Sequence, residues 1–330
     1  MAMNKNIYKS IIFIFIFLIM VPLFGCSAKK PTTISSNSAS SGAVSETIFP
    51  TQWEGKSRVT VLVMGLDLSD SRKGETPRGD TMILLSLDPI NHTAGIMSIP
   101  RDLWVNIPNI EYNRINTAYF YGEWRAMPGG GAELARQTVE QLIGLPINYY
   151  AVIDFDVFIK FIDEIGGVKV TPFQDVKIEK FGGGNEQVLM SGKTYTLDGA
   201  LALSYARERY VGDGDIDRAR RQQEIIMAVK NRILKFDTIS RLIIKAPILY
   251  QELLSGINTN LQLQEAIQLG ILALEIKNEN IKMGVIDYSM AIPQTLFDGR
   301  MILRAVPNKI RELRNNIFVN NINNVDMLSE

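Results

Sequence analysis

The amino-acid sequence predicts an α/β or α+β sandwich, in which helices cover both faces of a mixed central β-sheet. Two observations point to this fold class. Runs of β-branched and apolar residues alternate with longer stretches in which apolar residues recur at helical spacing. The composition, 46% hydrophobic and 21% charged, is typical of a globular chain. No internal repeat and no second apolar-poor linker interrupts the chain after residue 50, so we expect one domain over residues 51–330.

The first part of this domain is predicted to contain three neighbouring buried strands. They are the apolar runs Arg58–Leu66, Thr81–Leu87 and Thr93–Ile99. The Asp88-Pro89 turn signal separates the second run from the third. We therefore expect three strands of one sheet.

The remaining elements follow from periodicity and from stop signals such as Gly144 and Gly166-Gly167. Helices are predicted over residues 132–143, 155–165, 198–206, 216–234, 239–254 and 261–276, and strands over 149–153, 168–170, 281–286 and 301–306. This order places helices between strands along most of the chain, as a layered sheet-and-helix fold requires.

Residues 1–26 are interpreted as a targeting segment and excluded from the fold. An uncharged stretch lies between Lys9 and Lys29, most of it the apolar run from Ile11 to Val21, which is typical of a signal peptide or signal anchor. Cys26, in the context Leu-Phe-Gly-Cys-Ser, resembles a lipoprotein cleavage site and would then carry lipid. The alternative is an uncleaved transmembrane anchor. In both cases the rest of the chain lies outside the cytoplasm.

Residues 27–50 are rich in Ser, Thr, Ala and Asn, and are predicted to form a flexible tether. Such a tether would hold the folded domain away from a membrane surface. The arrangement suits an enzyme or receptor whose second partner lies in the cell wall or matrix.

Charge and residue counts exclude several classes of function. The 35 basic and 35 acidic residues balance to a formal charge of +0, which together with the export signal argues against a nucleic-acid-binding protein. The chain has one Cys and one His, which excludes an intramolecular disulfide and disfavours a zinc cluster or a His-dependent nucleophile. Any metal would therefore be held by oxygen ligands.

Charged residues gather where the first three predicted strands begin or end. These residues are Asp67, Arg78, Asp80, Arg101 and Asp102. If the first strand runs antiparallel to the second, all five fall at one edge of the sheet. Asp67 and Asp80 could then share an Mg²⁺ ion, because Mg²⁺ commonly takes one or two protein carboxylates. An isolated pair of this kind is more often a turn former and a cap.

A second charged cluster favours an anion-binding site over the interpretation as a turn former and a cap. Arg207 and Arg209 would lie on the same side of an extended backbone. Arg218 and Gln222 share one face of the helix that begins near residue 215, together with Arg221 and Ile225. Cations at a helix N-terminus oppose the helix dipole, a cost most easily tolerated where an anion binds. Arginine pairs match phosphate oxygens, so this cluster, with Arg78 and Arg101, is predicted to bind pyrophosphate.

Several short motifs together resemble the LytR-CpsA-Psr family. They run in family order as Val63-Met64-Gly65-Leu66-Asp67, Arg78-Gly79-Asp80-Thr81, Ser98-Ile99-Pro100-Arg101-Asp102, Arg114-Ile115-Asn116-Thr117, Tyr205-Ala206-Arg207-Glu208-Arg209 and Asp215 to Gln222. The resemblance covers about Arg58 to Met227. It implies a single catalytic domain of a membrane-attached enzyme, which moves a glycopolymer such as teichoic acid or capsule from undecaprenyl pyrophosphate onto peptidoglycan.

The resemblance also implies roles for individual residues. Asp67 and Asp80 match the family's metal-binding aspartates, which implies that they bind Mg²⁺, or Mn²⁺ in its place. The pyrophosphate-binding set is Arg78, Arg101, Arg114, Arg207, Arg209, Arg218 and Gln222, where Arg114 stands at a position at which many members carry Lys. Arg78, Asp80, Asp102 and Arg218 are expected to act in catalysis, with Asp80 or Asp102 taking the proton of the sugar hydroxyl.

Two other functions remain open from the sequence. A non-catalytic receptor for a polyprenyl pyrophosphate or glycopolymer would need the arginines but not both aspartates. A pyrophosphatase would use water in place of the sugar on the same site. Six aromatic residues between positions 104 and 124 could stack on sugars or pack in the core.

Overall fold

The computed structural model describes residues 53–66, 79–184, 186–235 and 256–318. Its largest element is a six-stranded sheet with the order β11-β6-β1-β2-β3-β12. The strands are β1 (Val59–Leu66), β2 (Thr81–Asp88), β3 (Thr93–Ser98), β6 (Tyr149–Asp154), β11 (Ile257–Thr259) and β12 (Ile281–Val285). The sheet is mixed, because β1 and β6 are parallel and β3 and β12 are parallel, whereas β1-β2 and β2-β3 are antiparallel.

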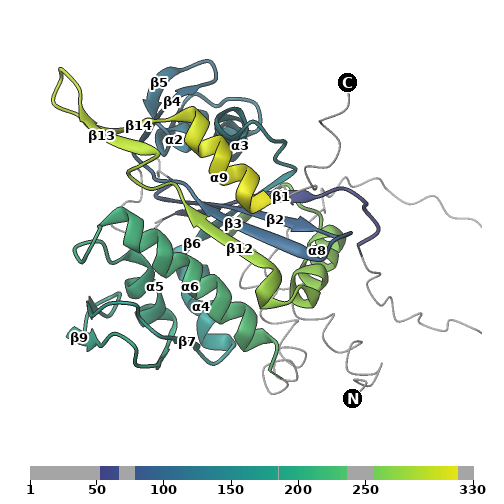
Figure 1. Cartoon of the computed structure of the whole chain (residues 1–330), viewed down its shortest axis with the longest axis vertical. Helices are drawn as coiled ribbons and strands as arrows, with labels where there is room; N and C mark the ends of the chain where they lie inside the picture. Colours follow the sequence, from purple (N-terminus) through teal and green to yellow (C-terminus); the bar gives the residue numbers. More distant parts are fainter. Residues whose placement is uncertain (1–52, 67–78, 185, 236–255, 319–330) are drawn as a thin grey trace, which may run out of the picture.

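Helices pack on both faces of this sheet, as the sequence predicts (Figure 1). They are α2 (Thr117–Trp124), α3 (Gly130–Ile143), α4 (Phe155–Glu164), α5 (Gly199–Arg207), α6 (Asp215–Ile233), α8 (Leu263–Glu275) and α9 (Pro307–Phe318). None of the helices in this described part of the chain has the length and apolarity that crossing a bilayer requires.

The alternation of side chains along β1 explains the two faces. Leu62, Met64 and Leu66 are buried in the main core, which α3 and α9 close. Val59 and Val61 point to the other face and pack with Leu261, Ala266 and Leu269 around α8. Each β1 side chain buried in this way contributes about 1.5–3 kcal/mol to folding.

On the face that bears α8, helix α6 is held to the end of β3 by Gln223. Its amide nitrogen donates to Ser98 Oγ at 2.9 Å and to the Gly284 carbonyl of β12 at 2.7 Å. A separate cluster that includes Phe161, Tyr205 and Ile225 packs α4, α5 and α6 together. The start of α6 is thereby fixed beside the edge of the large sheet.

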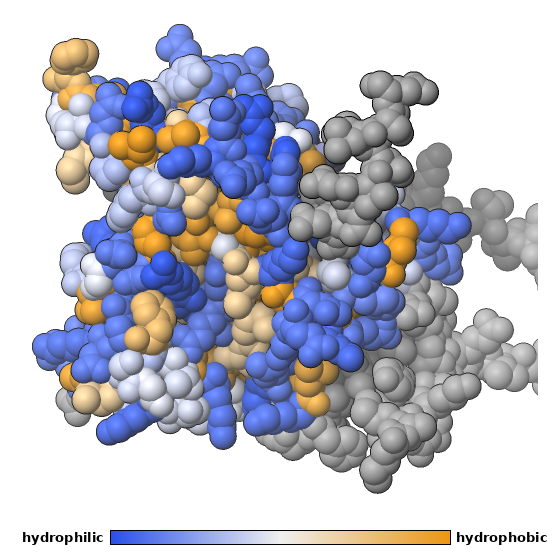
Figure 2. Space-filling view, viewed as in Figure 1, coloured by the Kyte–Doolittle hydropathy of each residue, from blue (hydrophilic) through white to orange (hydrophobic). Residues whose placement is uncertain are grey.

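A second, smaller sheet was not predicted. Its strand order is β13-β14-β4-β5, with β13 (Ala291–Thr295), β14 (Met301–Ala305), β4 (Leu103–Ile107) and β5 (Glu111–Arg114). Strands β7 (Val168–Val170) and β10 (Tyr195–Leu197) form one two-stranded sheet, and β8 (Val176–Glu179) and β9 (Glu186–Leu189) form another. The β13-β14 hairpin projects from the molecule, and Figure 2 shows hydrophobic side chains at its end.

Most predicted boundaries agree with the structure to within a few residues. The predicted helix 239–254 and the segments 1–26 and 27–50 lie outside the described residues. Helix α9 was missed, because Ile310, Ile317 and Phe318 are its only buried residues. The end of α9 packs closely on β3 at Gly95, because a Cβ at this position would lie only 2.5 Å from Phe318 Cδ1.

Candidate active site

Two charged residues that flank neighbouring strands meet where these strands of the large sheet begin or end. The register pairs Ile83 of β2 with Ser98 of β3, so the start of β2 lies beside the end of β3. Asp80 directly precedes β2, and Arg101 follows β3 after a short turn. Arg101 Nη1 lies 3.2 Å from Asp80 Oδ2. The structure thus brings these two side chains together, at the edge that the antiparallel pairing predicts.

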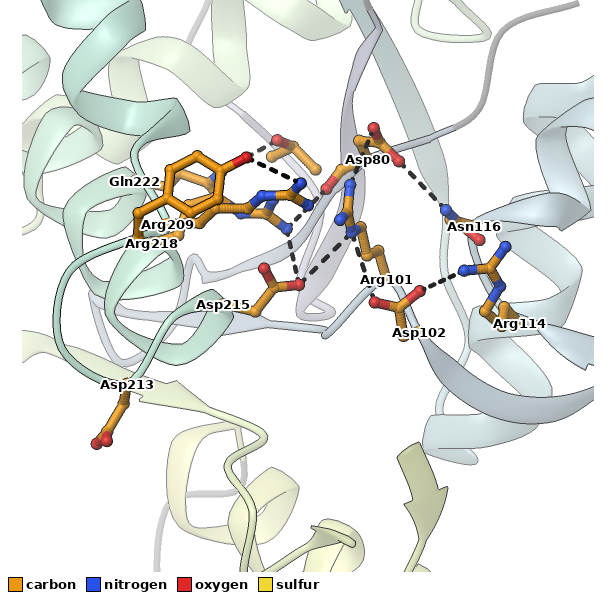
Figure 3. Close-up of polar contacts among 12 residues, drawn as sticks. Asp80, Arg101, Asp102, Arg114, Asn116, Arg209, Asp213, Asp215, Arg218 and Gln222 are labelled. Carbon is orange, nitrogen blue, oxygen red and sulfur yellow. Dashed lines mark hydrogen bonds and ion pairs between the residues drawn. The ribbon is translucent and has the colours of Figure 1, made fainter. Parts of the chain in front are cut away.

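Arg101 is the centre of a larger ionic network (Figure 3). Its Nε lies 3.6 Å from Asp102 Oδ2 and 3.5 Å from Asp215 Oδ2. Asp102 Oδ1 in turn lies 3.0 Å from Arg114 Nη1 on β5. The network therefore joins the large sheet, the start of α6 and the small sheet.

The first turns of α6 supply two more of the predicted residues. Arg218 Nη2 lies 3.1 Å from Asp215 Oδ2 and donates to the Asp80 carbonyl at 3.4 Å. One turn later, Gln222 Nε2 donates to Thr81 Oγ1 and to the Ala206 carbonyl, both at 3.1 Å. These contacts hold one face of α6 against the beginning of β2.

A pocket of about 550 Å³ opens beside this network. Its charged lining consists of Arg101, Lys180, Arg207, Arg209 and Arg218 together with Asp80, Glu179 and Glu208. Five cationic side chains thus stand against three acidic ones, which favours an anionic ligand. Gln222 adds an amide to the wall, and Phe155, Ile178 and Phe181 add apolar surface.

Arg207 and Arg209 both line the pocket, but by a route that differs from the predicted one. Arg207 is the last residue of α5, and only from Glu208 onward is the backbone extended. The Arg207 guanidinium lies 4.9 Å from the Phe155 ring and 5.0 Å from the Phe181 ring. Contacts of a cation with two aromatic rings restrict its orientation toward the pocket.

The Arg218 guanidinium is held with little access to water, since its side chain is only 11% exposed. Burial lowers the pKa of Arg218 from its ordinary value, whereas the charges of Asp215 and Asp80 act in the opposite direction. Arginine nevertheless stays protonated at neutral pH. A buried cation of this kind gains strongly from an anion placed beside it.

Asn116 belongs to one of the motifs that resemble the family but was given no role, and it contacts the site. It precedes α2, the position at which an Asn side chain usually caps a helix, but its side chain makes no capping hydrogen bond. Instead, Nδ2 donates to Asp80 Oδ1 at 3.2 Å. Its Oδ1 is buried and has no hydrogen-bond partner among the described residues.

Arg221 has a different role from the one its helix position indicates. Its side chain is completely buried and donates to the Glu208 carbonyl, between the two pocket arginines Arg207 and Arg209. It also lies 6.0 Å from the Tyr205 ring. We interpret Arg221 as a support for the Arg207–Arg209 segment.

The glycine-rich loop after β8, to which the sequence assigned no function, forms part of the pocket. Lys180, Phe181, Gly182 and Gly183 all line it. Lys180 Nζ also lies 2.8 Å from Asp198 Oδ2 at the start of α5. The signal for this loop was present only as an aromatic residue followed by three glycines.

The other predicted residues are not among those that line the pocket in the described part of the chain. Asp67, Arg78 and Cys26 fall outside the described residues. Asp102 and Arg114 belong to the ionic network but not to the pocket lining. Within residues 53–66, 79–184, 186–235 and 256–318, no group of three His, Cys, Asp or Glu side chains could hold a metal ion. Of the predicted metal pair, the structure thus describes Asp80 alone.

Comparison with known proteins matches residues 20–318 to the LytR_cpsA_psr family. The polyisoprenyl-teichoic acid–peptidoglycan teichoic acid transferase TagT of Bacillus subtilis is 30% identical over 274 residues, which cover 80% of this chain and 79% of TagT. The crystal structure of B. subtilis TagV is similar with a TM-score of 0.63 and 26% identity, covering 79% of this chain and 96% of TagV.

A structure of TagT with bound octaprenyl pyrophosphate lipid is also similar, with a TM-score of 0.57 and 27% identity over 79% of this chain and 89% of that one. The matched region includes the large and the small sheet, all the helices named above and every described residue of the ionic network. The chain therefore belongs to the LytR-CpsA-Psr family.

Proposed function

We propose that the protein transfers a glycopolymer, such as teichoic acid or capsule, from undecaprenyl pyrophosphate to peptidoglycan. The reaction would take place at the outer face of the bacterial cell membrane, to which residues 1–26 attach the chain. One observation carries the proposal: Arg101, Arg207, Arg209 and Arg218 converge with Asp80 on a single pocket. The name of TagT and the octaprenyl pyrophosphate in its structure support the same chemistry.

The pocket suits the headgroup of the carrier lipid. Guanidinium groups bind phosphate oxygens in pairs, and the pocket offers four of them. The apolar wall of Phe155, Ile178 and Phe181 would accept the first isoprenoid units. A site with both features distinguishes a lipid pyrophosphate from a free phosphate.

In the proposed reaction, a sugar hydroxyl of peptidoglycan attacks the phosphorus that carries the polymer. The bond between this phosphorus and the bridging oxygen breaks, and undecaprenyl phosphate leaves with that oxygen. Arg101 and Arg218 stabilise the negative charge that develops. The proton of the hydroxyl passes to Asp80 or Asp102, two of the three carboxylates that contact Arg101.

The residues at Asp80 also fit a divalent cation. The Asp80 side chain is 37% exposed, and the unpaired oxygen of Asn116 belongs to the amide that contacts it. Both are hard oxygen ligands of the kind that Mg²⁺ prefers. Asp67 and Asp80 would hold Mg²⁺, or Mn²⁺ in its place, and the cation would neutralise charge on the pyrophosphate. Arg101 and Asn116 hold the Asp80 carboxylate in position.

The proposal is tested with Arg218→Gln and a matched control, Arg220→Gln. Arg220 lies on the same helix but is 52% exposed and contacts Asp217, away from the pocket. Full-length protein in detergent would be given radiolabelled lipid-linked teichoic acid and peptidoglycan sacculi. We expect Arg218→Gln to lower the rate of transfer by about a hundredfold or more, the effect of removing one transition-state donor, and Arg220→Gln to leave it unchanged.

The same assay distinguishes the two alternatives. Release of labelled polymer into solution, with none attached to sacculi, would indicate a pyrophosphatase. Lipid binding without turnover would indicate a receptor. Either result would contradict the proposed transferase, and full transfer by Arg218→Gln would contradict the role assigned to its pocket.

A further inference from the structure

A second pocket, of about 510 Å³, lies where the small sheet meets the end of α3 and the start of α9. Trp104 and Tyr112 form its aromatic wall, and Asn106 and Gln141 contribute amides. Its charged lining consists of Arg304 and Arg311 and, within the described residues, no acidic side chain. Tyr112 is 62% exposed, so its ring is not packed in the core and is accessible to a ligand.

The small sheet links this pocket to the ionic network of the candidate active site. Trp104 on β4 pairs with Arg114 on β5 and with Arg304 on β14, and directly paired residues share one face of a sheet. The row Arg304-Trp104-Arg114 therefore spans two strand spacings, about 10 Å. Arg114 is the last residue of this row, and its guanidinium forms an ion pair with Asp102 at 3.0 Å.

In the ionic network, Arg101 lies between residues of α6 and residues beside the small sheet. Arg209 and Arg218, from the loop after α5 and from α6, lie on one side of Arg101, whereas Asp102 and Arg114, on its other side, adjoin the small sheet (Figure 3). In phosphoryl transfer, the attacking and leaving oxygens lie roughly in line on opposite sides of the phosphorus. If the carrier lipid leaves on the side of α5 and α6, the attacking hydroxyl arrives from the side of Asp102.

The lining suits an anionic saccharide. Aromatic faces stack on the apolar faces of sugar rings, and amide side chains such as Asn106 and Gln141 bind hydroxyls. Arg304 and Arg311 offer charge-assisted hydrogen bonds to carboxylates. The Arg300 guanidinium lies 5.2 Å from the Trp104 ring, a contact that holds the indole at the rim of the pocket.

We propose that this second pocket binds the acceptor, a peptidoglycan strand whose muramyl peptide carboxylates contact Arg304 and Arg311 and whose sugar rings contact Trp104 and Tyr112. The inference rests on the proposed function, because it names the site of the second substrate. It places the attacking hydroxyl beside Asp102, the carboxylate nearest to the row of paired residues.

The test is direct binding of a soluble, uncross-linked peptidoglycan strand to the full-length protein, measured by calorimetry without donor lipid. We expect Trp104→Ala to weaken binding about tenfold, the loss typical of an aromatic anchor. Trp124→Ala is the matched control, since Trp124 is 63% exposed on α2 and lies outside the pocket lining. The double variant Arg304→Gln, Arg311→Gln should weaken binding of the strand but not of a neutral chitin oligosaccharide.

In the transfer assay, Trp104→Ala should raise the KM for the acceptor and leave kcat and octaprenyl pyrophosphate binding unchanged. Equal strand affinity of Trp104→Ala and the unmodified protein would overturn the proposal. So would competition between soluble teichoic acid and the strand for the same pocket, because the donor polymer would then be the occupant. Strand binding that depends on Trp104 in a protein without transferase activity would support the pocket while refuting the proposed function.

Discussion

At the scale of single residues, the orientation of the Asp80 carboxylate depends on Asn116, a residue to which the sequence assigned no role. Its two carboxylate oxygens contact different partners, Arg101 Nη1 at 3.2 Å and Asn116 Nδ2 at 3.2 Å. A carboxylate held from both sides keeps one orientation toward the pocket. In the proposed reaction Asn116 is therefore a positioning residue, since it would act on the pyrophosphate through Asp80.

We predict that Asn116→Ala lowers kcat for polymer transfer about tenfold, because one charge-assisted hydrogen bond to Asp80 is lost. Asn113→Ala is the control, because Asn113 donates to the Tyr121 hydroxyl and does not contact Asp80. The Mg²⁺ concentration at half-maximal activity is the decisive measurement, since it should rise for Asn116→Ala alone. An unchanged Mg²⁺ dependence would show that Asn116 acts only on the fold.

At the scale of elements, the turn between β2 and β3 aligns the two strands that carry the site. The Asp88 carboxylate accepts hydrogen bonds from the backbone amides of Ile90 and Asn91, both at 3.0 Å, and from Arg58 Nη2 at 3.0 Å. Burial acts to raise the pKa of Asp88, but the hydrogen bonds from Asn91 and Ile90 and the charge of Arg58 outweigh it, so that the pKa lies below its ordinary value.

A lowered folded-state pKa means that ionised Asp88 stabilises the fold above the ordinary carboxyl pKa, near 4, and that this contribution is lost as the pH falls through the folded-state value. We predict that Asp88→Asn lowers the free energy of unfolding at pH 7 by about 2 kcal/mol. The deficit should shrink at pH 3, as followed by urea denaturation. Asp298→Asn, in the exposed β13-β14 turn, should have little effect at either pH.

At the scale of the whole molecule, the site exists because distant parts of the chain meet. Asp80 and Arg218 are 138 positions apart, and Arg218 still donates to the Asp80 carbonyl. The small sheet joins β4 to β14 over a still longer stretch of the chain. The proposed lipid-linked substrate would also require this assembly to stay near the bilayer, a role that we propose for the first 26 residues.

We predict that Cys26 carries the lipid anchor, so that Cys26→Ser abolishes incorporation of radiolabelled palmitate into the protein in cells. In the same cells, polymer transfer to the wall should fall, because the chain loses its attachment or its processing. The purified variant should retain transfer in detergent, where carrier and enzyme mix freely. If the protein with its natural Cys26 takes up no palmitate but still sediments with membranes, this would instead indicate the uncleaved transmembrane anchor.

Local patterns predicted much of this molecule. The strands β1, β2 and β3 and the helices α3, α4, α5 and α6 agree with their predicted bounds to within a few residues. Each has a clear period of apolar residues or a stop signal, which act over one or two turns of chain. The antiparallel order of the first three strands was also enough to predict that Asp80 and Arg101 would meet.

Other features left no local trace. The small sheet depends on pairing between β4 and β14, which are far apart in the chain. Strand β4 does alternate buried and more exposed residues, but over five residues only, and β5 has four. Asn116 carries the signature of a helix cap, but its side chain bonds to Asp80 instead. The second pocket arises only where α3, α9 and the small sheet come together.

The order of amino acids by itself determined the fold class, most of the elements and the two charged clusters, because periodicity and strand ends are properties of neighbouring residues. Only the tertiary structure decided which guanidinium groups share the pocket, that Arg114 contacts Asp102, and that Asn116 contacts Asp80. These contacts join residues from separate elements, so they depend on packing, which no stretch of sequence contains.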